Sequence, residues 1–196
     1  RVLFYDKNLS TTNTISCSSC HQQAFGFSDQ LQASVGVNGA TSRHSMRLIN
    51  ARFAAEDNFF WDERAPTLEA QTTQPIRDHA EMGFSGTNGA PSFVDLITKL
   101  ESIAYYDELF TLAFGDTDIT EARIQLALGQ FIRSIQSFDS RFDEGLAQRN
   151  LNQPFPNFTA EENRGKALYL GRARCQPCHR APEFDIDPNS RNNGIV

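Results

Sequence analysis

The sequence lacks the features that direct a chain to a membrane or a nucleic acid. No run approaches the roughly 20 apolar residues of a membrane-spanning helix, and no secretory signal is recognisable. Positive charge is in deficit, with 18 Lys and Arg against 24 Asp and Glu, so we expect no binding to nucleic acid. Low-complexity tracts are absent too, and the 39% of hydrophobic residues are enough for a folded core.

Cysteine and histidine are scarce, and their placement is informative. The four cysteines form two identical patterns, Cys17-Ser-Ser-Cys20-His21 and Cys175-Gln-Pro-Cys178-His179, which also take two of the four histidines. No cysteine is left over. A disulfide framework has no need for a histidine after each pair, so this arrangement disfavours one.

The Cys-x-x-Cys-His pattern is the attachment signature of a c-type haem. Cysteines at i and i+3 of a helical turn project to the same side, where their thiols can bond both vinyl groups of one porphyrin. The adjacent histidine then ligates the iron, so His21 and His179 are the expected axial ligands. A redox dithiol and half of a zinc site are the alternatives, but neither explains both histidines. We therefore predict two covalently bound haems.

The remaining sequence predicts helices and long loops, an all-α fold. Helices are expected over 120–138, with Thr120 as N-cap, over about 92–103 and 105–113, and from the capping box at Thr159 to about Leu170. Residues 26–44 and 83–91 are expected to be loops and 152–156 a linker. No convincing strand pattern is present. Because only 17 residues follow His179, we expect both ends of the chain to be cut.

The sixth position of each iron decides between electron transfer and reaction with small oxygen species. For the first haem, the candidate ligands are Met46, Met82, His44 and His79. For the second haem, no methionine or histidine follows His179, so we expect its ligand to lie beyond Val196 or earlier in the chain.

The order of motifs resembles the bacterial di-haem cytochrome c peroxidase and MauG family. The resemblance runs from Arg1 to the end of the chain. Its most specific block is Phe60-Trp61-Asp62-Glu63-Arg64-Ala65, followed by Leu68, Gln71, Pro75 and Glu81-Met82-Gly83.

This resemblance implies two cytochrome c-like haem domains of unequal function. Residues 1–153 would form the N-terminal peroxidatic domain, and residues 154–196 the start of a truncated C-terminal electron-transfer domain. Trp61 would be the electron bridge between the haems, Glu81 the distal acid-base group and Gln71 its neighbour in the pocket. Taken singly, the same residues also fit a core aromatic, a solvated carboxylate and a surface amide.

Two departures from the family pattern concern the first haem. The glycine-rich loop Gly36–Arg43 has no histidine to cap the resting iron, which suggests a five-coordinate first haem without activation. His44 stands where the family has an asparagine that helps to bind calcium, and imidazole lacks the oxygen that calcium prefers. Whether the chain binds calcium is therefore left open. His44 becomes a candidate ligand of the first haem iron in its resting state.

The resemblance implies a cytochrome-c peroxidase that reduces hydrogen peroxide with electrons from a small cytochrome c or copper protein. A periplasmic location follows from c-type haem attachment, and a homodimer from the resemblance. A MauG-like enzyme that oxidises a protein or organic substrate is the first alternative. The second is a non-enzymatic carrier in which Met82 ligates the first haem.

Overall fold

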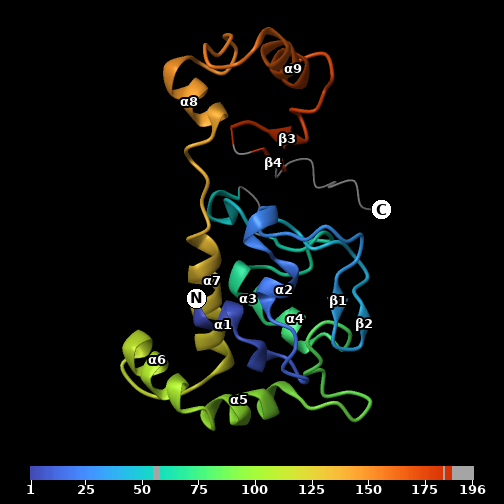
Figure 1. Ribbon diagram of the computed structural model, residues 1–196, viewed down its shortest axis with the longest axis vertical. Coiled ribbons are helices and arrows are strands. Elements are labelled where there is room, and N and C mark those ends of the chain that lie inside the picture. Colours follow the sequence, from blue (N-terminus) through green and yellow to red (C-terminus); the bar gives the residue numbers. More distant parts are fainter. Residues whose placement is uncertain (55–57, 183, 187–196) are drawn as a thin grey trace. The chain divides into compact units, whose positions relative to one another are not determined.

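The computed structural model describes residues 1–54, 58–182 and 184–186, and most of its regular structure is helical (Figure 1). The helices are α1 (Val2–Tyr5), α2 (Cys17–Cys20), α3 (Leu68–Thr72), α4 (Gln74–Arg77), α5 (Phe93–Glu101), α6 (Ala104–Phe114), α7 (Glu121–Arg133), α8 (Arg141–Gln148) and α9 (Ala160–Leu170), with 3-10 turns at Lys7–Leu9, Gln23–Phe25 and Ala51–Phe53. Among the described residues, no helix has the length and hydropathy needed to cross a membrane.

The expectation of an all-α fold needs one correction, because two small antiparallel hairpins are present. Strand β1 (Val35–Gly36) pairs with β2 (Gly39–Ala40), and β3 (His179–Arg180) pairs with β4 (Asp185–Ile186). Strands of two residues are too short to show the alternation by which a strand is recognised in a sequence. The mostly helical character is confirmed, whereas a second cytochrome-like domain is not evident in the described residues.

The chain divides into two compact units. The first comprises Arg1–Ile49 and Asn58–Ser134, and the second comprises Asn50–Asp57 and Ile135–Val196 as far as these are described. The haem-domain boundary predicted after Gln153 falls inside the second unit. The predicted boundary separates two haem-binding domains, whereas the two units are defined by their compactness. The boundary therefore stays a prediction.

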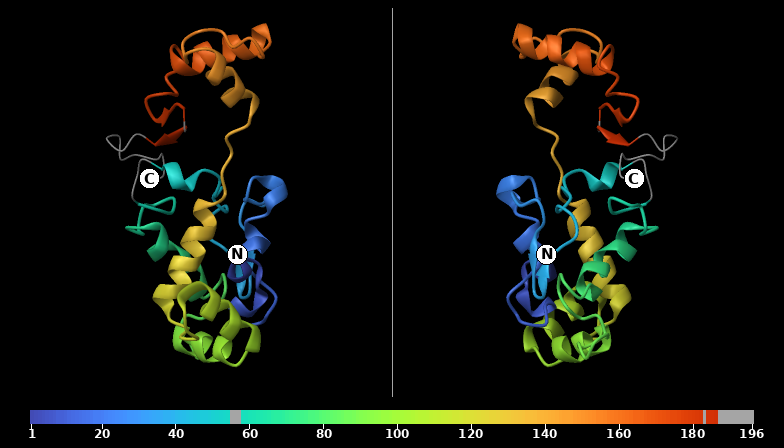
Figure 2. Two further views of the ribbon diagram at one scale, coloured as in Figure 1. Left: turned by 90° about the vertical axis from the view of Figure 1, so that its left-hand side faces the viewer. Right: turned by 90° about the vertical axis from the view of Figure 1, so that its right-hand side faces the viewer.

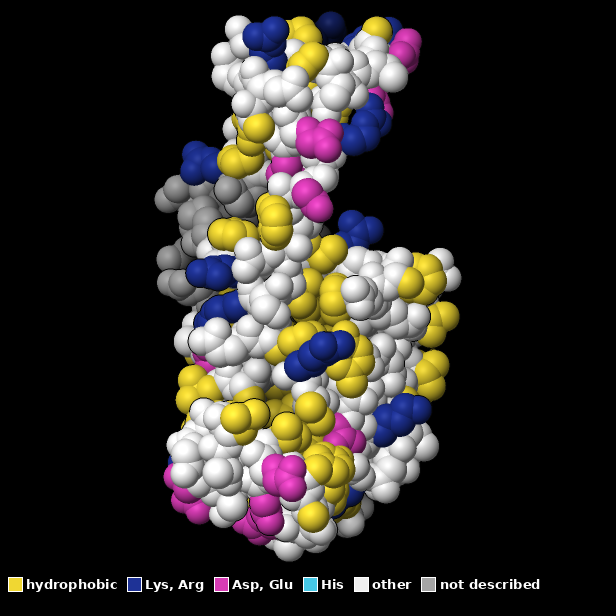
Figure 3. All heavy atoms as spheres, turned by 60° about the vertical axis from the view of Figure 1, so that its left-hand side comes forward, with side chains coloured by type: hydrophobic (Ala, Val, Ile, Leu, Met, Phe, Trp, Pro, Cys, Tyr) yellow, Lys and Arg dark blue, Asp and Glu magenta, His cyan; other side chains and the backbone are white. Residues whose placement is uncertain are grey.

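Helix α7 is the central element of the first unit, where it runs beside α1 and α3 (Figures 1 and 2). Thr120 caps it as predicted, by accepting a hydrogen bond from the Arg123 amide. Ile124, Leu128 and Ile132 are buried at four-residue spacing, which gives the helix its core-facing stripe. Apolar side chains also gather on the surface of this unit, as Figure 3 shows, and the exposed ones include Val2 and Tyr5.

Helix α7 ends at Arg133, five residues before the predicted end. Beyond it, the chain pairs with Asn50 instead of continuing the helix. The Asn50 amide donates to the carbonyl of Ile135 (2.9 Å), and the side-chain oxygen of Asn50 accepts from the Ser137 amide (2.8 Å). A distant asparagine thus replaces the hydrogen bonds that another helical turn would have made.

The second unit is built around α8 and α9. The predicted capping box at Thr159 is present, and α9 ends at Gly171 as expected. The segment predicted as a linker instead contributes Phe155 to the core, where it is 1% exposed and packs against the ring of Phe142 at a centroid distance of 5.5 Å. Gly145 of α8 allows this, because a Cβ there would lie 2.3 Å from the Phe155 ring.

Candidate functional site

Helix α2 presents the first Cys-x-x-Cys-His pattern. Ser16 and Ser19 form a capping box that fixes the start of this single turn. The amide of His21 donates to the carbonyl of Cys17 (2.8 Å), which closes the turn. Cys17 and Cys20 therefore stand on one side of a helical turn, as the spacing predicted.

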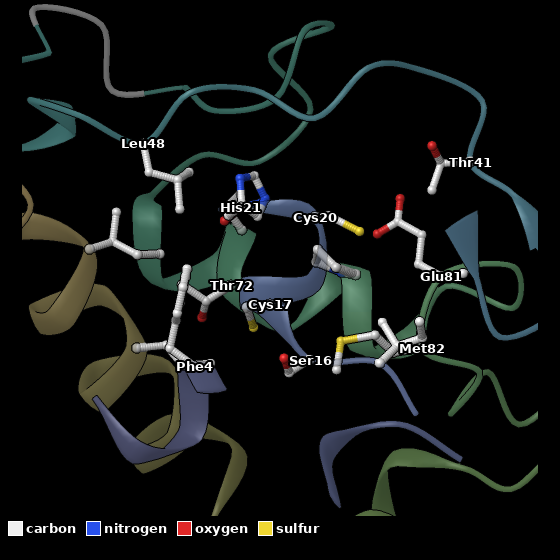
Figure 4. A pocket seen from close by; sticks show the side chains of 16 residues that line it. Phe4, Ser16, Cys17, Cys20, His21, Thr41, Leu48, Thr72, Glu81 and Met82 are labelled. Carbon is white, nitrogen blue, oxygen red and sulfur yellow. The ribbon is translucent and has the colours of Figure 1, made fainter. Parts of the chain in front are cut away.

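Both cysteines and His21 line one pocket of the first unit (Figure 4). The cavity itself has a volume of about 70 Å³. Its other walls are mostly apolar, with a few polar groups among them. They include Phe4, Leu48, Leu128, Ile132, Thr41, Thr72, Gln71, Glu81 and Met82.

The chemistry of these groups fits a covalently bound haem better than the alternatives. Nδ1 of His21 lies 2.9 Å from the carbonyl oxygen of Phe27, the type of contact that orients a metal-ligating imidazole. Burial lowers the pKa of His21, which favours the neutral ring that a metal requires. Burial raises the pKa of Cys17 to about 12, the opposite of a reactive redox thiol. Among the described residues, no group of three or more His, Cys, Asp or Glu could hold a metal ion.

Glu81 enters this pocket from a segment whose backbone is held on two sides. Its amide donates to Asp78 Oδ1 (3.0 Å), and its carbonyl accepts from the Val37 amide (2.9 Å). Gly36 permits this close approach, since a Cβ there would lie 2.1 Å from the carbonyl oxygen of Ala80. The carboxylate end of Glu81 points toward Cys20 (Figure 4).

The surroundings of Glu81 suit a group that exchanges protons near neutral pH. Burial raises the pKa of Glu81 to about 7, the negative charge of Asp78 adds to the rise, and Arg64 opposes it. At such a pKa, the carboxyl group can both accept and donate a proton at neutral pH.

Gln71 reaches the same pocket from helix α3. Thr67 caps this helix by accepting from the Ala70 amide (3.0 Å), and an ion pair between Glu69 and Arg133 joins α3 to α7. The structure thus brings Gln71 and Glu81 together with the haem-attachment residues. Met82, which is 3% exposed, also lines the pocket, so the ligand candidate of the carrier alternative is present there as well.

Trp61 is half-buried and is not among the residues that line this pocket. Its indole Nε1 donates to the carbonyl oxygen of His44 (2.9 Å). The side chain of His44 is held by Ser28 and Leu31, and His79 is exposed with Nδ1 3.2 Å from Ser85 Oγ. These two histidines and Met46 also stand outside the pocket lining.

The second pattern lies in the second unit and repeats the turn of the first. The His179 amide donates to the carbonyl of Cys175 (2.9 Å), although here the residues form a turn rather than a helix. Cys178 and His179 are exposed. The hydroxyl of Tyr169 donates to the carbonyl of His179 (2.5 Å), which ties the turn to α9. Within residues predicted for this haem domain, 183 and 187–196 lie outside the described part of the chain.

No sequence motif pointed to the polar residues that hydrogen-bond to the end of helix α2. Ser45 Oγ donates to the carbonyl of Cys20 (3.0 Å) and accepts from the amide of Asp29 (3.0 Å). Ser28, Asp29 and Ser34 are buried although they lie in a segment that looks like an ordinary polar loop. The sequence carries almost no pattern that would identify them, because only the fold shows that these side chains point inward.

The sequence of the chain is similar to those of known proteins. A family model described as di-haem cytochrome c peroxidase matches residues 1–150. The methylamine utilization protein MauG of Methylorubrum extorquens is 32% identical over 95% of this chain and 50% of its own length. Cytochrome c551 peroxidase of Nitrosomonas europaea is 31% identical over 93% and 50%. The chain thus spans about half the length of these curated relatives.

A solved structure shares the fold. The crystal structure of a MauG-like protein associated with microbial copper homeostasis superimposes with a TM-score of 0.73 at 31% identity, covering 94% of this chain and 55% of that one. The agreement extends to the mostly helical architecture described above.

Proposed function

Because the chain belongs to the di-haem cytochrome c peroxidase family, we propose that it is part of an enzyme that reduces hydrogen peroxide to water. The observation that carries the proposal is Glu81, a carboxyl group with a pKa raised to about 7, in the pocket that also contains Cys17, Cys20 and His21. A protein that only carries electrons does not need an ionisable carboxyl group with a pKa near 7 in the pocket of the first haem. The overall reaction consumes one peroxide, two electrons and two protons and releases two waters.

In this proposal, Cys17 and Cys20 would bond the first haem covalently, and the imidazole of His21 would ligate its iron. The haem, when bound, supplies redox-active iron to the pocket. Cys175, Cys178 and His179 would hold a second haem in the same way. The mostly apolar walls of the first pocket suit a cofactor with large apolar faces.

The two polar side chains would manage the peroxide and its protons. The Glu81 carboxylate accepts a proton from one peroxide oxygen and returns it to the other, so that the O–O bond breaks with water as the leaving group. The amide of Gln71 donates a hydrogen bond that orients the peroxide. Trp61 would carry electrons toward the first haem site.

We further propose a small cytochrome c or copper protein as electron donor, a periplasmic location and a homodimeric assembly. The location is supported by the chemistry of c-type haem attachment, which takes place outside the cytoplasmic membrane. Calcium forms no part of the proposal, because His44 offers no oxygen ligand.

The test is peroxide turnover by the haem-loaded protein with a reduced small cytochrome c as donor. Replacing the acid-base group in Glu81→Gln should lower kcat by about 10²-fold, within the range for general acid-base catalysis. Glu101→Gln, which changes an exposed carboxylate at the end of α5, is the matched control. Turnover by Glu81→Gln equal to the wild type would remove Glu81 from the mechanism.

A MauG-like oxidation of a protein or organic substrate is the second candidate. It is favoured by the 32% identity to MauG of Methylorubrum extorquens. The two candidates are separated by offering peroxide together with either the reduced cytochrome or an aromatic amino acid side chain in a peptide. Preferential consumption of the peptide would favour the second.

A further inference from the structure

His44 makes hydrogen-bond contacts with three residues, although it does not line the pocket. Its Nε2 is 3.0 Å from Ser28 Oγ, and its Nδ1 is 2.6 Å from the carbonyl oxygen of Leu31. Its own carbonyl accepts the indole N–H of Trp61 (2.9 Å). A histidine on a surface loop seldom has both ring nitrogens engaged, which indicates a specific role.

The partners of the two nitrogens hold the ring on both sides. The Leu31 carbonyl can only accept, so Nδ1 of His44 carries a hydrogen and donates it. Nε2 contacts the hydroxyl of Ser28, which donates to the Ser45 carbonyl at 2.7 Å.

A buried carboxylate lies beside the ring. Asp29 Oδ1 lies 3.5 Å from His44 Nδ1, and the Asp29 side chain is 3% exposed. The same carboxylate accepts from Ser34 Oγ (2.6 Å) and from the Leu31 amide (3.1 Å), so its position is set independently of His44.

The cluster of Ser28, Asp29, His44 and Ser45 joins two functional elements. On one side, Ser45 Oγ donates to the carbonyl of Cys20, the last residue of α2. On the other side, the His44 carbonyl receives Trp61. We propose that His44 is a positioning residue, whose ring contacts set the place of Trp61 relative to the haem-attachment turn. Only the consequence for electron transfer rests on the proposed function.

The spectroscopic test uses the haem-loaded protein and Trp61, the only tryptophan of the chain. The ultraviolet resonance Raman band that reports the indole N–H hydrogen bond should shift to a weaker bond in His44→Ala. The acceptor is a main-chain atom, so the substitution displaces it without deleting it. His44→Gln, whose amide can donate to the Leu31 carbonyl, should restore much of the wild-type band. His79→Ala is the matched control, since His79 is exposed.

A second measurement tests the contact of the ring with Leu31. Spectra of the protein with ¹⁵N-labelled histidine should show a hydrogen-bonded N–H at Nδ1 of His44, with the assignment made from its loss in His44→Gln. The absence of this N–H, or an unchanged indole band in His44→Ala, would overturn the inference.

A third measurement separates this inference from the proposed function. Electron transfer to the first haem should be slower in His44→Ala than in the wild type and should recover in His44→Gln. If no variant, wild type included, turned over peroxide while the indole band still shifted, the proposed function would fail and the positioning role would stand. An unshifted band in an active enzyme would refute the positioning role and leave the proposed function standing.

Discussion

The substitution Gly36→Ala would test how Glu81 is placed. A Cβ at residue 36 would lie 2.1 Å from the carbonyl oxygen of Ala80 and 2.7 Å from the Cα of Glu81, and real Cβ atoms essentially never come within 3.0 Å of such atoms. Both are backbone atoms, so a side-chain rotation cannot relieve the contact. The segment that carries Glu81 must shift by about 1 Å.

Such a shift should lower peroxide turnover by about 10²-fold, because a displacement of this size is enough to spoil a catalytic geometry. The strain should also lower the free energy of unfolding by roughly 1–3 kcal/mol, the usual cost of overpacking. Steady-state kinetics with a reduced cytochrome and a urea titration of the same preparation measure the two effects.

Gly165→Ala is the matched control, because a Cβ at residue 165 would meet nothing within 4 Å. It should leave turnover unchanged and stabilise helix α9 by up to about 1 kcal/mol. Wild-type turnover in Gly36→Ala would refute the idea that this close approach places Glu81.

Four further outcomes are expected. Turnover should rise with pH around 7 as the Glu81 carboxyl ionises, and this step should vanish from the pH profile of Glu81→Gln. The same group should make the fold less stable as pH rises from about 4.5 to 7, because in that range the folded state holds a proton that the unfolded state has released; chemical unfolding at several pH values measures this. Phe155→Ala should destabilise the second unit by about 3–5 kcal/mol, whereas a true linker residue would cost little in the same titration. Cys175→Ala with Cys178→Ala should lower the haem content from two per chain to one in a pyridine haemochrome assay, and an unchanged content would contradict the second attachment site.

Local patterns predicted the helices well and their ends less well. Thr120 and the capping box at Thr159 mark helix starts through bonds within three residues, and both are present. The end of α7 depends on Asn50, which is more than 80 residues away in the sequence, and the burial of Phe155 depends on the absence of a side chain at Gly145. Such long-range contacts leave no local signature.

The sequence by itself determined the kind of chemistry. Two Cys-x-x-Cys-His patterns that use every cysteine indicate covalent haem, since the spacing of two thiols and an imidazole is a local property of one helical turn. The tertiary structure decided which polar residues share a pocket with the first pattern. Gln71 and Glu81 line it and Trp61 does not.

The tertiary structure also decided the surroundings of the key groups. The pKa of Glu81 is raised by burial, and the two nitrogens of His44 contact partners that lie 13 and 16 residues away in the chain. Burial and distant partners arise only when the chain folds, so residue identity could name Glu81 and His44 as candidates but could not give the contacts that hold them.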